Sequence, residues 1–165
     1  MQIKVKKLSE TAIVPTRADA GSAGWDLYAD APAQIPANGT VFIDTGIAVE
    51  IPEGYWGGIY ARSGLACKCG LRPANCVGVI DSSYRGAVKV ALHNDNDMFI
   101  WQNIHNSNTT FGQRIVQDYD ANKSISRGDR IAQLIIHKCE NVEFIETDEL
   151  SDSERGAGGF GSSGT

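Results

Sequence analysis

The stretch Arg130-Ile131-Ala132-Gln133-Leu134-Ile135-Ile136-His137 decides the fold class of this chain. Successive side chains of a strand point to opposite faces, so one face carries Ala132, Leu134 and Ile136 and the other carries Ile131, Gln133 and Ile135. Both faces are largely apolar, and we therefore expect a strand that is buried on both sides. A buried Gln133 needs hydrogen-bond partners, so a structural role and a site role both remain open for its amide.

Short apolar runs separated by turn residues make up most of the remaining chain. The expected strands are Ile3–Val5, Val41–Ile43, Ile47–Val49, Tyr55–Tyr60 and Ala87–His93. The chain has 18 glycines and no long amphipathic helical pattern, and we expect only one short helical turn after Arg62. Many short strands with glycine turns predict an all-β fold, either a sandwich or a jelly-roll-like barrel.

Two segments depart from this pattern. Residues 95–126 are rich in polar side chains but also carry Phe99, Trp101 and Phe111, so we expect an excursion from the sheet with an extra hairpin around residues 106–108. Residues 154–165 read Glu-Arg-Gly-Ala-Gly-Gly-Phe-Gly-Ser-Ser-Gly-Thr and have no apolar periodicity. We expect both segments to belong to a single domain that spans residues 1–165.

The composition limits the possible functions. The hydrophobic content of 42% and the charged content of 21% over 165 residues are typical of one globular domain. The net charge of −5 argues against a nucleic-acid or membrane partner, because both require a basic face. No signal peptide or membrane span is predicted, the cysteine spacing does not match a zinc site, and we expect a cytoplasmic protein, in the host cytoplasm if it is viral.

Two of the candidate chemical segments suit phosphate or a cation. Asp26, between apolar neighbours, is either a turn aspartate or a carboxylate near a divalent cation. Arg62-Ser63-Gly64 offers a planar cation, a hydroxyl and a permissive backbone, which suit a phosphate. The same three residues also fit a helix cap beside a solvated arginine.

A third segment runs from Asn75 to Gly86. Asp81 ends an apolar run and Tyr84 follows three residues later, which is typical of a hairpin whose edge is open to a flat ligand. An aspartate fixed there activates water, or it caps its own loop. The isolated histidines form no catalytic or metal pattern, and the sequence G-x-x-x-x-G-K-[ST] of a phosphate-binding loop does not occur.

The tail of residues 154–165 combines groups that a nucleoside triphosphate requires. Arg155 is able to grip a phosphate, Ser162 and Ser163 are able to donate hydroxyl protons, and Phe160 is able to stack on a base. Consecutive backbone N–H groups in a glycine-rich segment also form anion-binding concavities. The same composition is typical of a flexible tail or a cloning remnant.

These segments, in this order, resemble the five motifs of the trimeric dUTP diphosphatases (dUTPases). The matching segments are Ala23–Leu27, Arg62–Ala66, Asn75–Gly86, Gly128–Leu134 and Arg155–Gly164. Five motifs in order are far more specific than any one of them, so we interpret the tail as the fifth motif. The resemblance covers the chain except for the excursion.

The resemblance implies a jelly-roll-like all-β subunit of a homotrimer, with a flexible glycine-rich C-terminal arm and active sites assembled from all three chains. The implied reaction is the hydrolysis of dUTP to dUMP and pyrophosphate, which limits uracil incorporation into DNA and supplies dUMP for thymidylate synthesis. Asp81 would be the general base and would hold the 3′-hydroxyl. Tyr84 would pack on the deoxyribose.

The remaining implied contacts divide between base, phosphates and metal. Asn75 and the backbone near Gly78 and Ile80 would read the uracil edge. The implied phosphate contacts come from Arg62, Ser63, Gly64 and Gln133, and Asp26 would hold water bound to Mg²⁺, the implied cofactor. The arm of another subunit would complete the site, with Phe160 stacked on uracil. The distal phosphates would be bound by Arg155, Ser162 and Ser163, and Gly161 of the arm would also contact the substrate.

Two departures and two rivals qualify this resemblance. Ser163 stands where threonine is common, and the stretch between Asn94 and Arg127 is longer than usual, as in some phage dUTPases. A dCTP deaminase is the rival within the superfamily, but those enzymes use a glutamate near the third motif and lack the closing arm. A regulatory protein-binding module is the rival of another class: the aromatic residues of 95–126 contact a partner, or they pack the insert onto the trimer.

Overall fold

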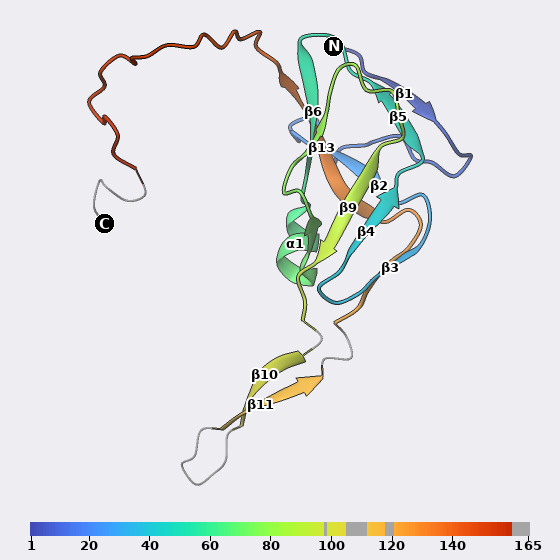
Figure 1. Ribbon diagram of the computed structural model, residues 1–165. Coiled ribbons are helices and arrows are strands. Elements are labelled where there is room, and N and C mark those ends of the chain that lie inside the picture. The colour runs from blue at the N-terminus through green and yellow to red at the C-terminus, as the bar shows by residue number, and fades with distance from the viewer. Residues whose placement is uncertain (98, 105–111, 118–120, 160–165) are drawn as a thin grey trace.

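The computed structural model describes residues 1–97, 99–104, 112–117 and 121–159, and it describes only the backbone of residues 99–104 and 112–117. The described residues form 13 strands and one short helix (Figure 1). Their bounds are β1 (Lys4–Lys7), β2 (Trp25–Tyr28), β3 (Ala33–Ile35), β4 (Thr40–Asp44), β5 (Ile47–Glu50), β6 (Tyr55–Tyr60), α1 (Ser63–Cys69), β7 (Leu71–Pro73), β8 (Gly78–Ile80), β9 (Lys89–Asn94), β10 (Phe99–Ile104), β11 (Gly112–Gln117), β12 (Lys123–Ile125) and β13 (Arg130–Lys138). The predicted all-β, jelly-roll-like class is confirmed.

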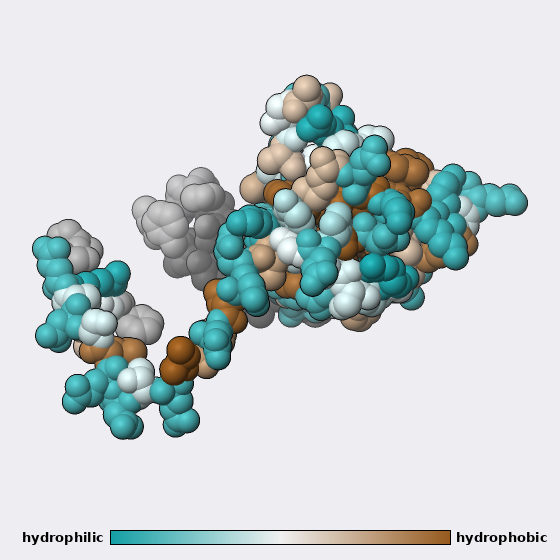
Figure 2. Space-filling view, turned by 90° about the horizontal axis from the view of Figure 1, so that it is seen from above, coloured by the Kyte–Doolittle hydropathy of each residue, from teal (hydrophilic) through white to brown (hydrophobic). Residues whose placement is uncertain are grey.

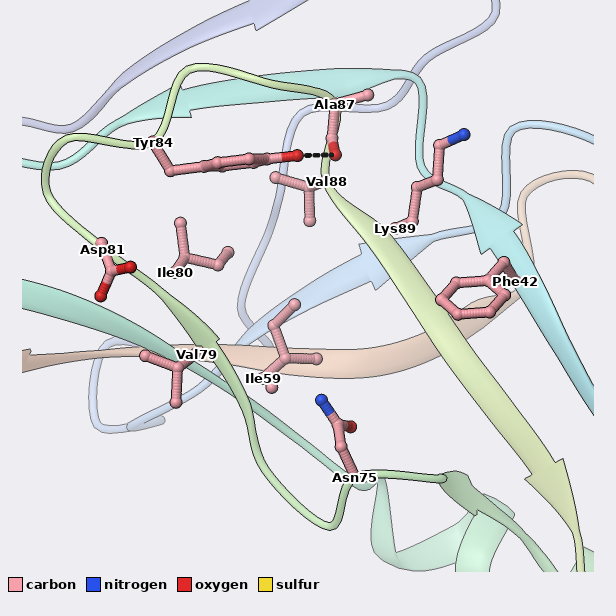
Figure 3. Close-up of a pocket in the computed structure, with 11 residues that line it drawn as sticks. Phe42, Ile59, Asn75, Val79, Ile80, Asp81, Tyr84, Ala87, Val88 and Lys89 are labelled. Carbon is pink, nitrogen blue, oxygen red and sulfur yellow. Dashed lines mark hydrogen bonds between the residues drawn. The ribbon is translucent and has the colours of Figure 1, made fainter.

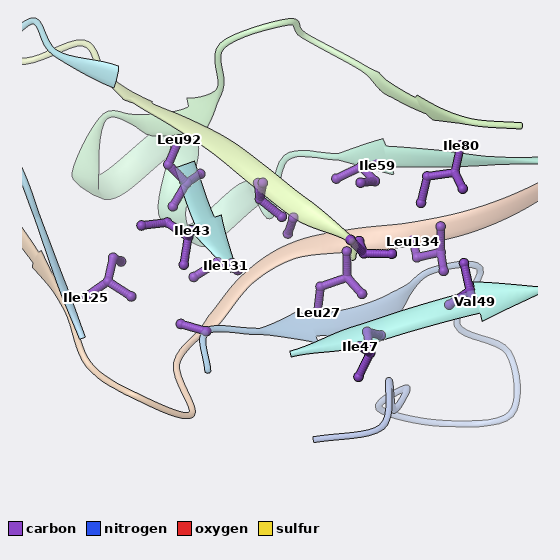
Figure 4. Packing of buried hydrophobic residues seen from close by; sticks show 14 of the residues in the cluster. Leu27, Ile43, Ile47, Val49, Ile59, Ile80, Leu92, Ile125, Ile131 and Leu134 are labelled. Carbon is purple, nitrogen blue, oxygen red and sulfur yellow. The ribbon is translucent and has the colours of Figure 1, made fainter. Parts of the chain in front are cut away.

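One apolar core lies between the antiparallel sheets (Figure 4). The larger sheet has the strand order β2-β13-β6-β8, and a second sheet has the order β4-β9-β7. Leu27, Ile47, Leu92 and Ile131 come from different strands and are almost completely shielded from solvent. Each such side chain contributes roughly 1.5–3 kcal/mol through the hydrophobic effect. The core thereby fixes the strand ends from which the site residues project.

Strand β13 lies inside the larger sheet, paired with β2 on one side and β6 on the other. A register shift between Arg130 and Ala132 lets the adjacent Ile131 and Ala132 both be buried, which simple alternation does not predict. Further along, Ile135 and Ile136 are only half-buried. This half of the strand is therefore less buried than predicted, although Ile136 still packs against the core cluster.

The expected helical turn after Arg62 is helix α1. Arg62 occupies the N-cap position without a side-chain capping bond, so the cap interpretation of Ser63 is not what the structure has. The helix ends at Gly70, whose φ of 67° is left-handed and whose N–H donates to the carbonyl of Ala66. No helix in the described residues is long and apolar enough to cross a membrane.

The expected extra hairpin is present as β10 and β11, which pair with each other and protrude from the body (Figure 1). Its tip at residues 106–108 lies outside the described residues. The expected excursion of 95–126 is too wide at both ends. Asp95 binds Arg72 through two hydrogen bonds of 2.8 and 2.9 Å, and β12 pairs with β3 and buries Ile125 in the core.

The chain after β13 leaves the body as an extended tail (Figures 1 and 2). Residues 140–157 are all exposed. Val142, Phe144 and Leu150 are 67%, 95% and 88% exposed, although each is apolar. Such a row of exposed apolar side chains indicates a segment whose contacts come from outside its own chain.

Candidate active site

The residues predicted from the third motif line one cavity of about 490 Å³ (Figure 3). These residues are Asn75, Gly78, Ile80, Asp81 and Tyr84. The cavity lies between β8 with its following turn and the strands β4 and β9 (Figure 3). The structure therefore brings together the predicted base-reading, catalytic and sugar-packing residues.

The cavity has polar groups at its ends and apolar side chains between them. Asn75 points into it from the turn between β7 and β8, and the carboxylate of Asp81 lies at the other end of β8 (Figure 3). Ile59, Ile80 and Val88 form the middle of the lining. A small number of polar groups around apolar walls suits a flat ring with hydrogen-bonding edges.

Gly78 makes room at the Asn75 end of the cavity. A Cβ atom at this position would lie 3.2 Å from Cβ of Ile59 and 3.4 Å from Nδ2 of Asn75. The preceding turn is tight, because the N–H of Cys76 donates to the carbonyl of Pro73 at 3.1 Å and Cys76 has a φ of 61°. A side chain on Gly78 would crowd Ile59 and would lie against the amide that is predicted to read the base.

The turn from Asp81 to Gly86 holds its own shape. The N–H of Tyr84 donates to the carbonyl of Asp81 at 3.1 Å, and the Tyr84 hydroxyl donates to the carbonyl of Ala87 at 3.0 Å (Figure 3). The Tyr84 ring lies so close to Gly86 that a Cβ atom there would be 2.6 Å from Cζ of the ring. Gly86 is thus required by the close approach of the tyrosine, and the ring forms one wall of the cavity.

The sequence did not predict the opposite wall of the cavity. Phe42 and Lys89 line it because β4 pairs with β9 in a register that sets Phe42 opposite Ala91 and Asp44 opposite Lys89. Phe42 is 73% exposed. The only available signal was the run Val41-Phe42-Ile43, in which three consecutive apolar residues of one strand cannot all face the core.

A second group of site residues surrounds Asp26, which is 6% exposed. Its Oδ1 accepts a hydrogen bond from Nε of Arg62 at 2.9 Å, and its Oδ2 accepts one from Nη1 of Arg130 at 3.4 Å. Gln133 lies opposite Asp26 in the β2–β13 register and opposite Tyr60 in the β13–β6 register. The first, second and fourth motifs therefore meet here, and Arg130 is a member that the sequence did not single out.

The two predicted site carboxylates, Asp26 and Asp81, lie at opposite edges of the larger sheet. Asp26 is on the edge strand β2, Asp81 directly follows the other edge strand β8, and β13 and β6 lie between them. Three spacings between neighbouring strands amount to roughly 14 Å. The structure of one chain thus does not bring the carboxylate expected near the cation next to the expected catalytic carboxylate.

The described residues contain no group of three or more histidine, cysteine, aspartate or glutamate side chains that could hold a metal ion. Each oxygen of Asp26 already accepts a hydrogen bond from an arginine. A carboxylate oxygen has a second lone pair, so these bonds leave Asp26 able to accept a hydrogen bond from water. The side chains present fit an indirect contact to a hydrated cation and do not form a protein-built metal centre.

The tail does not reach the cavity of its own chain. Residues 142–159 contribute nothing to its lining, and Nε of Arg155 donates instead to the carbonyl of Gly158 at 2.7 Å. Ser63 and Gly64 begin helix α1 and lie outside this cavity as well. The predicted residues Phe160, Gly161, Ser162 and Ser163 lie outside the described residues.

Known proteins resemble the chain over nearly its whole length. A family model described as dUTPase matches residues 10–164. A probable deoxyuridine 5′-triphosphate nucleotidohydrolase of Schizosaccharomyces pombe is 41% identical over 164 residues. The match covers 99% of this chain and 99% of that protein.

Two solved phage structures share the fold. The dUTPase of Staphylococcus bacteriophage 80alpha with dUPNHPP is 31% identical with a TM-score of 0.82, and the match covers 99% of each chain. A mutant dUTPase of phage phi11 of S. aureus, described with a structural Mg(II) ion, is 27% identical with a TM-score of 0.73, over 90% of this chain and 98% of that one. This chain belongs to the dUTPase family.

Proposed function

We propose that the chain is a dUTP diphosphatase, which hydrolyses dUTP to dUMP and pyrophosphate. The observation that carries the proposal is the cavity in which Asn75, Asp81 and Tyr84 converge around apolar walls. A nucleotide has the matching parts, namely a flat base with a polar edge, a sugar and a phosphate chain. The activity would limit uracil incorporation into DNA and supply dUMP for thymidylate synthesis, in the cytoplasm, or in the host cytoplasm if the protein is viral.

Asp81 is the proposed general base. Its carboxylate is exposed at the mouth of the cavity, so it is able to take a proton from the water that attacks the α-phosphorus. Asn75 and the backbone at Gly78 and Ile80 would bind the uracil edge. The Tyr84 ring would pack on the deoxyribose and leave no room for a 2′-hydroxyl.

Arg62, Ser63, Gly64 and Gln133 are the proposed phosphate contacts. Arg62 is only partly exposed and is oriented by Asp26 and by the carbonyl of Arg130, to which its Nη1 donates at 3.2 Å. We propose Mg²⁺ as the cofactor, with Asp26 reaching it through water. When bound, this cation neutralises charge on the triphosphate. The phi11 relative, described with a structural Mg(II) ion, supports a divalent cation in this family.

We propose a homotrimer whose active sites combine several chains, with residues 1–165 as a single domain and 154–165 as an arm lent to a neighbour. The separation of Asp26 from Asp81 across the sheet and the exposure of residues 140–157 both support this arrangement. A chain with Asp81→Asn and a chain truncated after Ser153 are each expected to be inactive. Mixed trimers should regain dUTP hydrolysis, because the two defects then fall at different sites. No recovery after verified subunit exchange would indicate sites built within one chain.

The substrate test is pyrophosphate release from dUTP, dTTP, dCTP and UTP under identical conditions. The proposal expects release from dUTP to dominate, because a site that leaves its own polar groups unpaired against a wrong base discriminates strongly. Ammonia release from dCTP would instead support the deaminase alternative. Equal rates for dUTP and UTP would contradict the role of the Tyr84 ring.

A second candidate function concerns the protruding hairpin, which we interpret as a phage-type insert. Strands β10 and β11 pair only with each other among the described strands and extend away from the body (Figure 1). The 80alpha relative carries a description in which phage dUTPases control the transfer of virulence genes, which supports a regulatory partner in this group of proteins. Pull-down experiments with the intact chain and with a chain lacking residues 98–120 test whether the hairpin binds one.

A further inference from the structure

Arg85 is a charged residue of the third motif to which the proposed reaction assigns no role. Its side chain is exposed and does not line the cavity beside Asp81. It nevertheless makes two short contacts, because its Nη1 donates to the carbonyl of Ser82 at 2.6 Å and to the carbonyl of Tyr84 at 2.8 Å. A single guanidinium nitrogen thus joins two carbonyls of the turn that carries Asp81.

The turn has little else to hold it. Asp81, Ser83, Tyr84 and Arg85 are all exposed, so burial of apolar surface contributes little to its geometry. The described contacts within it are the Tyr84–Asp81 backbone bond and the Tyr84 hydroxyl bond to Ala87. Neither of these bonds involves the carbonyls of Ser82 and Tyr84. Charge-assisted hydrogen bonds are roughly twice as strong as neutral ones, so the arginine supplies a substantial part of the constraint.

The surroundings of Arg85 hold its guanidinium on the side of the turn away from the cavity. Arg85 lines a groove of about 350 Å³ together with Lys4, Lys6 and Glu50 of strands β1 and β5. Glu50 is negatively charged there, because the hydrogen bond from Lys4 lowers the pKa of its carboxyl, and the charge of Arg85 lowers this pKa further. Arg85 therefore shares a groove with the carboxylate of Glu50, while its Nη1 contacts the carbonyls of the turn.

We propose that Arg85 is a positioning residue, which holds the carbonyls of the Asp81–Gly86 turn from the side of the β1–β5 groove and so fixes the Asp81 carboxylate and the Tyr84 ring in the cavity. The proposal rests on the proposed dUTP hydrolysis for its kinetic consequences. Arginine suits the role better than lysine, because its planar fork is pre-organised and always charged.

The test compares Arg85→Ala and Arg85→Lys with Lys6→Ala, which changes a cation of the same groove that makes no contact to the turn among the described interactions. A misplacement of about 1 Å in a catalytic group costs on the order of 10²-fold in rate. We expect Arg85→Ala to lower kcat for dUTP by roughly this factor and to raise the ratio of kcat/KM for UTP to that for dUTP. Arg85→Lys should recover part of both effects, and Lys6→Ala should change neither.

The outcomes separate this proposal from a general structural role and from the proposed function itself. An Arg85→Ala variant with unchanged kcat and an unchanged UTP-to-dUTP ratio would overturn the proposal. An Arg85→Ala variant that loses thermal stability but keeps the UTP-to-dUTP ratio of kcat/KM of the original chain would also overturn it. If the unmutated chain does not hydrolyse dUTP, the proposed function fails, and crystal structures of both chains then decide: an unmoved Asp81–Gly86 turn in the variant refutes the positioning role, and a displaced one supports it.

Discussion

The turn from Asp81 to Gly86 and the tail after β13 are both exposed, yet only the turn is held in place. Within the turn, backbone, tyrosine and arginine hydrogen bonds involve four of the six residues. The tail is joined to the body at its start, where the N–H of Cys139 donates to the carbonyl of Gly54 at 2.8 Å. Beyond residue 141, the hydrogen bonds of its described residues are local, such as those from Arg155 to the carbonyl of Gly158 and from the N–H of Gly156 to Oγ of Ser153. The difference indicates that the chain pre-organises the carboxylate proposed as the general base, whereas the described part of the tail depends on contacts from elsewhere for a fixed conformation.

This difference has an energetic consequence. Fixing the backbone of one residue costs roughly 1–2 kcal/mol, so ordering the tail requires a partner surface or a charged ligand to offset that cost. The exposed apolar residues Val142, Phe144 and Leu150 supply area for a protein surface, and Arg155 supplies charge for phosphate. Substitutions in the turn should therefore act without a partner, and changes in the tail should act only when the nucleotide and, in the proposed trimer, the neighbouring subunits are present.

The largest expected effect comes from Asp81→Asn. The amide keeps the shape of the side chain but loses the basic carboxylate, so turnover of dUTP should fall by about 10²–10⁴-fold. Binding of a non-hydrolysable dUTP analogue, measured by calorimetry, should remain close to that of the unmutated chain. Near-normal turnover in this variant would remove Asp81 from the role of general base.

The next largest effect is expected from truncation after Ser153. The deletion removes Arg155 and the hydroxyls of the fifth motif, and loss of such charge-stabilising donors typically costs about 10²–10³-fold in turnover. The melting temperature should stay unchanged, because the deleted residues that the structure describes are exposed or half-exposed. Deletion of Thr165 alone is the control. A truncated chain that melts at a lower temperature would show that the tail packs on its own body. That result would contradict the contrast between a turn that is held in place and a tail that is not.

Gly86→Ala tests the rigidity of the turn with a smaller effect. The new methyl group would lie within 2.6 Å of the Tyr84 ring, and such overpacking typically costs about 1–3 kcal/mol of unfolding free energy. The ring should move, so UTP should become a better substrate relative to dUTP. Gly21→Ala, whose added atom meets only the end of the Asp19 side chain at 3.3 Å, is the matched control for denaturation. Equal stability of the two variants would mean that the turn adapts freely.

Residues close together in sequence were predictable, and residues joined only by strand pairing were not. Asn75, Asp81 and Tyr84 lie within ten positions, and the structure places them in one cavity as the resemblance implied. Phe42 and Lys89 join that cavity through the β4–β9 register, and Arg130 joins Asp26 through the β2–β13 register. A register depends on the whole sheet, so single segments of sequence carry no signal for it.

The bounds of the excursion were also mispredicted because strand pairing is not visible in a single segment of sequence. Polar composition suggested 95–126, but Asn94 donates through Nδ2 to the carbonyls of Ile35 and Ala121 at 3.1 and 2.7 Å. Ala121 is fully buried, and β12 follows directly. A polar composition indicates that a segment is solvated but does not show whether its backbone pairs with another strand. The composition therefore assigned β12, a short strand that belongs to the core, to the insert.

The smallest expected effect is that of replacing residues 98–120 with a short turn. The two ends already lie close together, because the side chain of Asn94 contacts the carbonyl of Ala121, and closing a shorter loop costs less entropy. Hydrolysis of dUTP should stay within a few-fold of the original rate, since no motif residue is lost. Replacement of all of 95–126 is the matched control: it removes β12 and the buried Ile125, whose loss should cost about 2–5 kcal/mol. A folded chain without 98–120 that has lost dUTP hydrolysis would place part of the active site in the hairpin and would contradict the assignment of catalysis to the body and the arm.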